Sequence, residues 1–363
     1  MKAYVVEKER LENNLRMIKA QAGDTPIWAV VKGDGYGLGV VPLAKICREN
    51  GISRFAITEI WEGKALRDAG FIQEEILMLR ATSEKEELEQ MLDCNLIATV
   101  GSQADAVVLN GLAVERGTVA EAHLKIDTGM GRYGFLPTEM DKIVSIYDYM
   151  EGIAVSGVYT HFHSAFCSEK KTWQQYEKFQ EVLKQITQAG YETGMVHCAN
   201  SSALFLYPQM RMGGVRVGSA LLGRLSCKGN FGLKPVGHCQ AQVEELRWIP
   251  KGHTCGYGAA WKAKHPTQIA IVDVGWYHGF GVEKGRDVFR IRDCIRGQLS
   301  LLKAAVLGRA FYAAIDGKKC RVLGHIGMLN IVLDVTDIEC AVGDPVTLEI
   351  NPLLVKGMPV EFR

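Results

Sequence analysis

The amino-acid sequence predicts an α/β barrel of the TIM-like (β/α)8 type over residues 1–230, followed by an all-β C-terminal domain over residues 231–363. Three observations favour this fold. Short apolar runs alternate with longer amphipathic segments, eight such runs occur before about residue 226, and short β-branched segments follow after about residue 233. A doubly wound sheet, the main alternative, would usually contain fewer strands.

The eight apolar runs are rich in Val, Ile, Leu and Ala and lack strict alternation, as expected of parallel strands buried on both faces. They are PIWAVVK (26–32), RFAIT (54–58), EILMLR (75–80), NLIATV (95–100), AHLKID (122–127), IAVSGVYT (153–160), GMVHCA (194–199) and GGVRVG (213–218). Strands in this order, each followed by a helix, predict a closed barrel with an outer ring of helices.

Five segments between the runs have the apolar period of a helix. They are VPLAKICREN (41–50), EIWEGKALRDAG (59–70), SEKEELEQMLDC (83–94), TEMDKIVSIYDYM (138–150) and TWQQYEKFQEVLKQITQAG (172–190). Ser83 and Glu86 have the spacing of a capping box, which predicts the start of the third helix.

The residues after about 233 predict strands, because they form short segments separated by Gly or Pro and no long helical period is apparent. The segments are HCQAQVEELRWIP (238–250), HTCGYGAAWKA (253–263), TQIAIVDVGW (267–276), LLKAAVLG (301–308), KCRVLGHIG (319–327), NIVLDVTDI (330–338) and DPVTLEI (344–350). The boundary between the two domains is expected within SCKGNFGLKPV (226–236).

Composition and charge exclude several classes of protein. The 363 residues carry a formal net charge of +1, which indicates neither a nucleic-acid nor a membrane partner. No apolar run reaches the length of a signal peptide core at the N-terminus or of a membrane span elsewhere. The ten cysteines are scattered without a CxxC pair, so reduced thiols in a cytoplasmic protein are expected, and no metal site.

Lys32 is the most informative residue, because it ends the first apolar run and precedes the glycine-rich segment GDGYGLG. Burial can remove the charge of such a lysine and make it a nucleophilic amine. The glycines allow the backbone to close around a phosphate, and Tyr36 offers a hydroxyl. A lysine beside a phosphate cradle is what pyridoxal 5'-phosphate requires. The alternative is an ordinary lysine at the end of a strand, followed by a loop.

Polar residues also end or follow other runs, and the barrel would bring them to one rim. They are Lys125, Asp127 and Arg132 at the fifth run, His161 and His163 at the sixth, His197, Asn200 and Ser201 at the seventh, and Arg216, Gly218 and Ser219 at the eighth. Each set has a structural alternative: a helix cap for Asn200 and Ser201, a hydrogen-bonded rim histidine for His161 or His163, and a plain turn for KIDTGMGRYG.

The chain resembles the alanine racemase family of pyridoxal-phosphate enzymes over nearly its whole length. The motifs that carry the resemblance are VVKGDGYGLG, KIDTGMGRYGF, the THF at 160–162, HCANSSA, VRVGSALLG, the GYG at 256–258, GHIGM, and VGDPV with NPLL after it. The family pairs a TIM-like barrel with a β-domain, so the resemblance implies the same fold, pyridoxal 5'-phosphate as the cofactor, and a small amino acid as the substrate.

The resemblance also implies a role for each matching residue. Lys32 matches the lysine that holds the cofactor covalently and acts as one proton-transfer base; Tyr257 matches the second base, which reaches the active site of the other subunit. A homodimer with shared active sites is therefore implied. The other matches are Tyr36, Asn200, Ser201, Gly218 and Ser219 around the cofactor, Arg216 facing its pyridine nitrogen, His161 beside that arginine, Arg132 and Met328 at the substrate carboxylate, and Lys125, which is carbamylated in some members.

Several positions depart from the family pattern near the implied substrate entrance. A tyrosine of the family is replaced by Trp276, two aspartates by His278 and Leu329, and two arginines by Val282 and His325. Phe166 stands where an acidic residue is usual. No equivalent of a C-terminal tyrosine that narrows the pocket is found. These changes leave open a racemase of a different or broader set of amino acids, serine or larger.

Two further alternatives belong to other classes of protein. A non-catalytic pyridoxal-phosphate-binding relative would lack the β-domain and the tyrosine base, both of which this chain has. A decarboxylase or aldolase of similar architecture would usually pair the pyridine nitrogen with an acidic residue, and Arg216 argues against it. The sequence therefore favours an amino-acid racemase, most simply one that interconverts L- and D-alanine by two bases.

Overall fold

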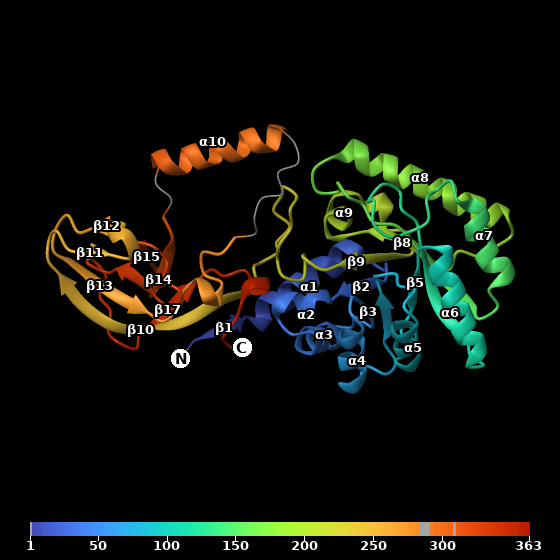
Figure 1. Ribbon diagram of the computed structural model, residues 1–363, viewed down its shortest axis with the longest axis horizontal. Helices are drawn as coiled ribbons and strands as arrows, with labels where there is room; N and C mark the ends of the chain where they lie inside the picture. The colour runs from blue at the N-terminus through green and yellow to red at the C-terminus, as the bar shows by residue number, and fades with distance from the viewer. Residues whose placement is uncertain (1, 284–290, 308–309) are drawn as a thin grey trace. The chain divides into compact units, whose positions relative to one another are not determined.

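The computed structural model describes residues 2–283, 291–307 and 310–363. The chain forms two compact units: Lys8–Val236, and Met1–Glu7 together with Gly237–Arg363 (Figure 1). The first residues thus belong to the second unit, whereas the sequence-based boundary at residue 230 placed them with the barrel. The reason is that β1 (Ala3–Val6) pairs with strands from the C-terminal part of the chain.

The unit Lys8–Val236 contains the predicted parallel barrel. Its sheet has the order β4-β3-β2-β9-β8-β7-β6-β5, and a parallel bridge from Leu77 to Ile97 joins the two ends. Seven of the eight strands lie within the predicted runs, and β6 begins two residues before its run. The strands are β2 (Ile27–Val30), β3 (Arg54–Ile57), β4 (Glu75–Met78), β5 (Ala98–Val100), β6 (Ala120–Lys125), β7 (Ile153–Tyr159), β8 (Met195–Ala199) and β9 (Gly214–Val217).

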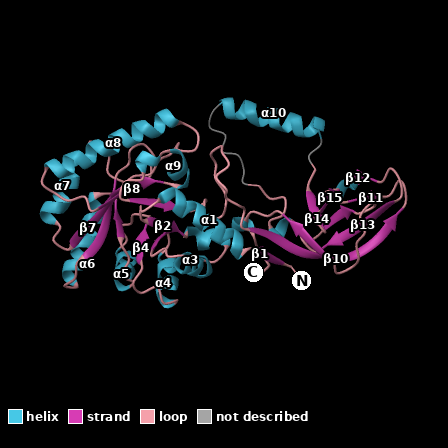
Figure 2. Cartoon of the chain, turned by 180° about the vertical axis from the view of Figure 1, so that it is seen from behind, coloured by secondary structure: helices cyan, strands magenta, loops and turns pink. Residues whose placement is uncertain are grey.

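Helices follow the strands, and the five predicted helical segments are helical in the structure (Figure 2). The helices are α1 (Lys8–Ala22), α2 (Lys32–Gly37), α3 (Val40–Glu49), α4 (Ile60–Asp68), α5 (Lys85–Asp93), α6 (Gln103–Glu115), α7 (Met140–Tyr149), α8 (Glu169–Gln188) and α9 (Ser201–Leu206). The capping box predicted at Ser83 is wrong. The N-cap of α5 is Glu84, whose backbone N–H donates to Thr82 Oγ1.

The second unit is a β-domain whose main sheet has the order β13-β16-β15-β14-β17-β10-β1-β18. The long strand β10 also pairs with β13, so part of this sheet closes on itself. The strands are β10 (Gly237–Ile249), β11 (Thr254–Cys255), β12 (Trp261–Lys262), β13 (Thr267–Val272), β14 (Tyr312–Ile315), β15 (Lys318–Leu323), β16 (Ile331–Asp334), β17 (Pro345–Leu348) and β18 (Val360–Phe362).

One element of the β-domain differs from the prediction. The segment LLKAAVLG was expected to be a strand, but residues 301–307 belong to the helix α10 (Ile291–Leu307). Ile291, Ile295, Leu299 and Leu302 recur at helical spacing along it, and all four are exposed. Leu, Lys and Ala have high helix propensity, so the local residues favour the helix that the structure contains. No helix within the described residues is long and apolar enough to cross a membrane.

Candidate active site

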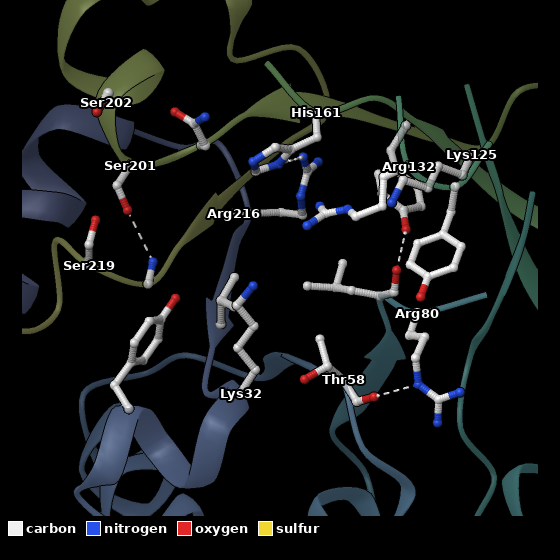
Figure 3. A pocket seen from close by; sticks show the side chains of 17 residues that line it. Lys32, Thr58, Arg80, Lys125, Arg132, His161, Ser201, Ser202, Arg216 and Ser219 are labelled. Carbon is white, nitrogen blue, oxygen red and sulfur yellow. Dashed lines mark hydrogen bonds between the residues drawn. The ribbon is translucent and has the colours of Figure 1, made fainter. Parts of the chain in front are cut away.

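The ends of the barrel strands surround a cavity of about 430 Å³. Ten of the twelve residues to which the resemblance gives a role line this cavity, from strands or loops that are distant along the chain. They are Lys32, Tyr36, Lys125, Arg132, His161, Asn200, Ser201, Arg216, Gly218 and Ser219. Figure 3 shows Lys32, Arg132 and Arg216 extending from different elements into the same space.

The loop after Lys32 is an unusual left-handed turn. Residues 33–36 of α2 all have positive φ, between 52° and 63°, and two of them, Asp34 and Tyr36, are not glycine. Each such residue costs energy unless its surroundings hold it. The buried carboxylate of Glu62 accepts hydrogen bonds from the backbone N–H groups of Asp34 and Thr58, and Asp34 Oδ1 accepts one from Val40 N–H. These bonds hold the predicted glycine-rich turn in place.

The Lys32 amine is suited to accept a proton or to bind a carbonyl group covalently. Burial lowers the pKa of Lys32 below its usual value, and the nearby positive charge of Arg132 lowers it further. A lower pKa increases the fraction of neutral amine near neutral pH, and only the neutral amine is a nucleophile or a base.

Tyr36, Ser201 and Gly218 form a tight cradle beside Lys32. Ser201 Oγ accepts a hydrogen bond from Gly218 N–H at 3.1 Å, and the Tyr36 ring packs against the Gly218 backbone. A Cβ atom at position 218 would overlap the Tyr36 hydroxyl and lie 2.8 Å from its Cζ. Glycine is therefore required here by close approach, and the hydroxyls and N–H groups together can bind a phosphate.

Replacing Gly218 with alanine should weaken cofactor binding without unfolding the barrel. The added methyl group displaces the Tyr36 hydroxyl, and overpacking of this kind costs about 1–3 kcal/mol. We expect the Kd for pyridoxal phosphate to rise about 10- to 100-fold, measured by absorbance titration. Gly111→Ala is the matched control, because no atom lies within 4 Å of a Cβ built there. Equal affinity of Gly218→Ala and Gly111→Ala would contradict the assigned cradle.

Asn200 and Ser219 lie beside this cradle and line the cavity. The helix-cap alternative applies to Asn200, since its Oδ1 accepts a hydrogen bond from Ala203 N–H at the start of α9. Its Nδ2 also donates to the backbone carbonyl of Phe162. Asn200 thus positions the segment that carries Ser201.

Arg216 is buried inside the barrel without a carboxylate partner among the described residues. Its guanidinium donates to the backbone carbonyls of Thr160 and His197, at 2.6 and 2.9 Å, and to His197 Nδ1 at 2.7 Å. His161 Nδ1 lies 3.5 Å from the same guanidinium. Burial, with the charge of Arg216 next, lowers the pKa of His161 well below its usual value, so that this imidazole is neutral.

Lys125 and Arg132 also line the cavity, and Asp127 lies on the turn between them. The Asp127 carboxylate accepts hydrogen bonds from the backbone N–H groups of Gly129, Met130 and Arg132 and thereby closes the DTGMGR turn. Lys125 Nζ lies 5.3 Å from the ring centre of Tyr133 and 5.5 Å from that of Tyr159. Burial and the charge of Arg132 lower the pKa of Lys125 to about 7.

The cavity also contains residues that the sequence analysis missed. Thr58, Leu79, Arg80 and Tyr133 line one side. Arg80 Nη1 forms an ion pair with Glu87 Oε2 at 2.8 Å, which holds the Arg80 side chain in this wall. Only its position at the end of the third apolar run could have indicated it, and no motif marks it.

The remaining two candidates, Tyr257 and Met328, lie in the β-domain. Tyr257 is 79% exposed and sits on the GYG turn, where a Cβ at Gly256 would lie 2.8 Å from His325 N. Tyr257 and His325 line a separate cavity of about 390 Å³. The backbone carbonyl of Met328 accepts a hydrogen bond from Tyr277 N–H. Each unit thus carries part of the predicted residue set.

The positions that depart from the family pattern have different environments within the β-domain. His278 is buried, and its Nδ1 accepts a hydrogen bond from Gly275 N–H. Trp276, Val282 and Leu329 are exposed. Trp276 and His325 line a further cavity of about 490 Å³ with Trp261, Phe280 and Arg321. His278 therefore supports the local backbone and does not replace a charge on the surface.

Comparison with known proteins agrees with the fold. The family model for the alanine racemase N-terminal domain matches residues 6–226, and that for the C-terminal domain matches residues 236–352. The chain belongs to the alanine racemase family. The alanine racemase of Methanococcus maripaludis is 32% identical over 94% of this chain and 87% of its own length, and that of Halothermothrix orenii is 30% identical over 93% and 84%.

Solved structures of the family have the same architecture. Alanine racemase of Clostridium difficile 630 superposes with a TM-score of 0.86 at 26% identity, covering all of this chain and 95% of the other. This likeness confirms the barrel and the β-domain predicted from the sequence. Pyridoxal phosphate is the cofactor of the family, and the residues present fit it. Lys32 offers the amine, the cradle offers phosphate ligands, and Arg216 offers a cation without a paired carboxylate.

Proposed function

We propose that this chain is a cytoplasmic, homodimeric racemase that interconverts L- and D-alanine with two bases, Lys32 and Tyr257, from different subunits. The observation that supports it most is the position of Lys32. Its amine has a lowered pKa and shares a cavity with a phosphate cradle and a buried arginine. When bound to this lysine, pyridoxal phosphate supplies an electron sink for the pair of electrons left on Cα.

Lys32 removes or returns the Cα proton on one face of the substrate. The reaction needs a second base on the opposite face, and its proton affinity must suit the working pH. The exposed Tyr257 hydroxyl, on a turn braced against His325, suits a group that serves a neighbouring chain. One subunit then contributes Lys32 to each site, and its partner contributes Tyr257.

Arg132 binds the substrate carboxylate in this proposal. An arginine guanidinium can hold a carboxylate by two parallel hydrogen bonds. The turn closed by Asp127 fixes the Arg132 backbone, which limits how far the side chain moves. Arg216 keeps its positive charge beside the pyridine ring because it cannot accept a proton. In the holoenzyme this arginine would leave the pyridine nitrogen without a proton, which would weaken the electron sink and limit side reactions such as transamination.

The proposal is tested by incubating the purified holoenzyme with L-alanine in ²H₂O. We expect D-alanine to form and deuterium to enter at Cα, read by chiral chromatography and mass spectrometry. L-Serine and larger amino acids are assayed side by side to measure the alternative of a broader substrate range. Relatives named alanine racemase do not favour this alternative. Deuterium exchange without D-product, or release of CO₂, would contradict a racemase.

Lys125 should be carbamylated in this proposal. A pKa of about 7 leaves a neutral amine near neutral pH, and only a neutral amine adds CO₂. The resulting carbamate is negative and would balance Arg132 and Arg216, which both act on Lys125. We expect a ¹³C carbamate signal when the protein is equilibrated with ¹³C-bicarbonate. The signal should weaken below pH 7, where the amine is protonated.

The Lys125→Ala variant should lose this signal and at least about tenfold in kcat/KM, since Arg132 loses a neighbour that positions it. Lys45→Ala, at an exposed position on α3, is the control and should keep both. A carbamate signal that persists in Lys125→Ala would assign the modification to another lysine.

A further inference from the structure

Two histidines form a buried chain behind Arg216. His197 Nδ1 lies 2.7 Å from Arg216 Nη1, and His197 Nε2 lies 2.9 Å from His123 Nδ1. His123 is on β6, His197 on β8 and Arg216 on β9, and none of the three side chains is more than 3% exposed. The cavity that holds Lys32 is lined by Arg216 but by neither histidine, so the two act only through Arg216.

The protons on this chain can have only one arrangement. An arginine guanidinium donates and never accepts, so His197 Nδ1 must present its lone pair to Arg216. A neutral His197 therefore carries its proton on Nε2 and donates it to His123 Nδ1. His123 in turn must be protonated on Nε2. Burial, followed by the charge of Arg216, lowers the pKa of His123 to about 3, so both rings are neutral over the working range of pH.

Packing holds both rings in these orientations. The His197 ring stacks on Tyr159, with centroids 4.9 Å apart and an interplanar angle of 9°, and it also stacks on Trp28 at 5.9 Å. The His123 ring meets Trp28 edge-on at 5.6 Å. The pairing of β6 with β7 shifts register at His123, opposite Gly157, where a Cβ would lie 2.6 Å from His123 Nε2. The absence of a side chain at Gly157 makes room for the ring.

We propose that His123 is a positioning residue for the racemase reaction, which fixes the tautomer of His197 and thereby the place and charge of Arg216. This inference rests on the proposed function. Without an acceptor at residue 123, His197 either leaves a buried N–H group unsatisfied or moves its proton to Nδ1. In the second case two donors face each other, and Arg216 shifts away. These neutral acceptors hold Arg216 and leave its positive charge in place, whereas a carboxylate would cancel that charge.

A matched pair of variants separates hydrogen bonding from packing. Asparagine can place its Oδ1 near the position of His123 Nδ1, whereas leucine has similar volume and no acceptor. We expect His123→Asn to keep kcat within about threefold of the unmodified protein. His123→Leu should lower kcat about tenfold, equivalent to about 1.4 kcal/mol, with little change in KM. The absorbance maximum of the lysine-bound cofactor should shift in the leucine variant alone. Equal kcat values and spectra for the two variants at equal thermal stability would overturn the proposal.

A second measurement needs no activity. ¹⁵N NMR of the protein labelled at its nine histidines separates protonated from unprotonated ring nitrogens. We expect two histidines with the proton on Nε2 that do not titrate between about pH 5 and 9, one of which is lost in His123→Asn. A charged His123 or His197, or a proton on His197 Nδ1, would overturn the inference even if the leucine variant fails to fold. If the unmodified protein has these tautomers but no racemase activity, the result would count against the proposed function and not against this inference.

Discussion

Replacing Lys32 with alanine should abolish racemisation and remove the visible absorbance band of the lysine-bound cofactor. The variant lacks both the covalent anchor and one of the two proposed bases. Loss of a general base alone costs about 10²- to 10⁴-fold, so we expect kcat/KM to fall by at least about 10⁴-fold. The measurements are the absorbance spectrum after gel filtration and the rate of D-alanine formation.

Two controls make this result specific. Lys45→Ala, exposed on α3, should keep the band and the activity. Borohydride reduction of the unmodified holoenzyme followed by peptide mass mapping should find the cofactor on the peptide that contains Lys32. A reduced cofactor attached to any other lysine would reject the central assignment.

Mixing two inactive variants should restore activity. Each variant loses one base. Tyr257→Phe should be slower by about 10²- to 10⁴-fold, and Lys32→Ala, which also loses the covalent anchor, by at least about 10⁴-fold. After complete subunit exchange, half of the dimers are mixed, and each mixed dimer has one site with both bases. We therefore expect about one quarter of the unmodified activity, measured with alanine at saturation.

The matched control mixes Lys32→Ala with the double variant Lys32→Ala/Tyr257→Phe, in which no dimer has a complete site. Differently tagged chains and native mass spectrometry verify that exchange has occurred. If mixed dimers form and activity stays at the level of the control, each active site lies within a single chain, and the shared-site proposal is wrong.

Much of the barrel could be predicted from the sequence because its strands are buried on both faces. Such strands appear in the sequence as continuous apolar runs, and each of the eight runs overlaps one strand of the barrel. The rim residues could also be predicted, because the carboxyl ends of parallel strands share one edge of the barrel. Their gathering around one cavity follows from topology alone, whereas their chemical roles came from the family resemblance and stay predictions.

Other features depend on three-dimensional contacts that a sequence pattern does not contain. The left-handed turn at Asp34 and Tyr36 is held by Glu62, a residue of a later helix. The room for the His123 ring depends on a register shift between β6 and β7, which places Gly157 opposite His123. The helix α10 was predicted as a strand because a short apolar run fits either element by its periodicity, although its Leu, Lys and Ala residues favour a helix.

The strand β1 has a consequence for how the molecule is made. It pairs with β10 and β18, and Lys2 forms an ion pair with Asp273, which lies 271 residues later in the chain. At a synthesis rate of about 5–20 residues per second, the ribosome needs roughly 15 to 55 s to produce that partner. The barrel residues leave the ribosome within this interval, so the barrel can close while the β1 strand still has exposed edges. An unpaired strand is prone to pair with other chains. Nascent chains translated from the same messenger RNA can therefore aggregate with one another through β1 until the last third of the protein emerges.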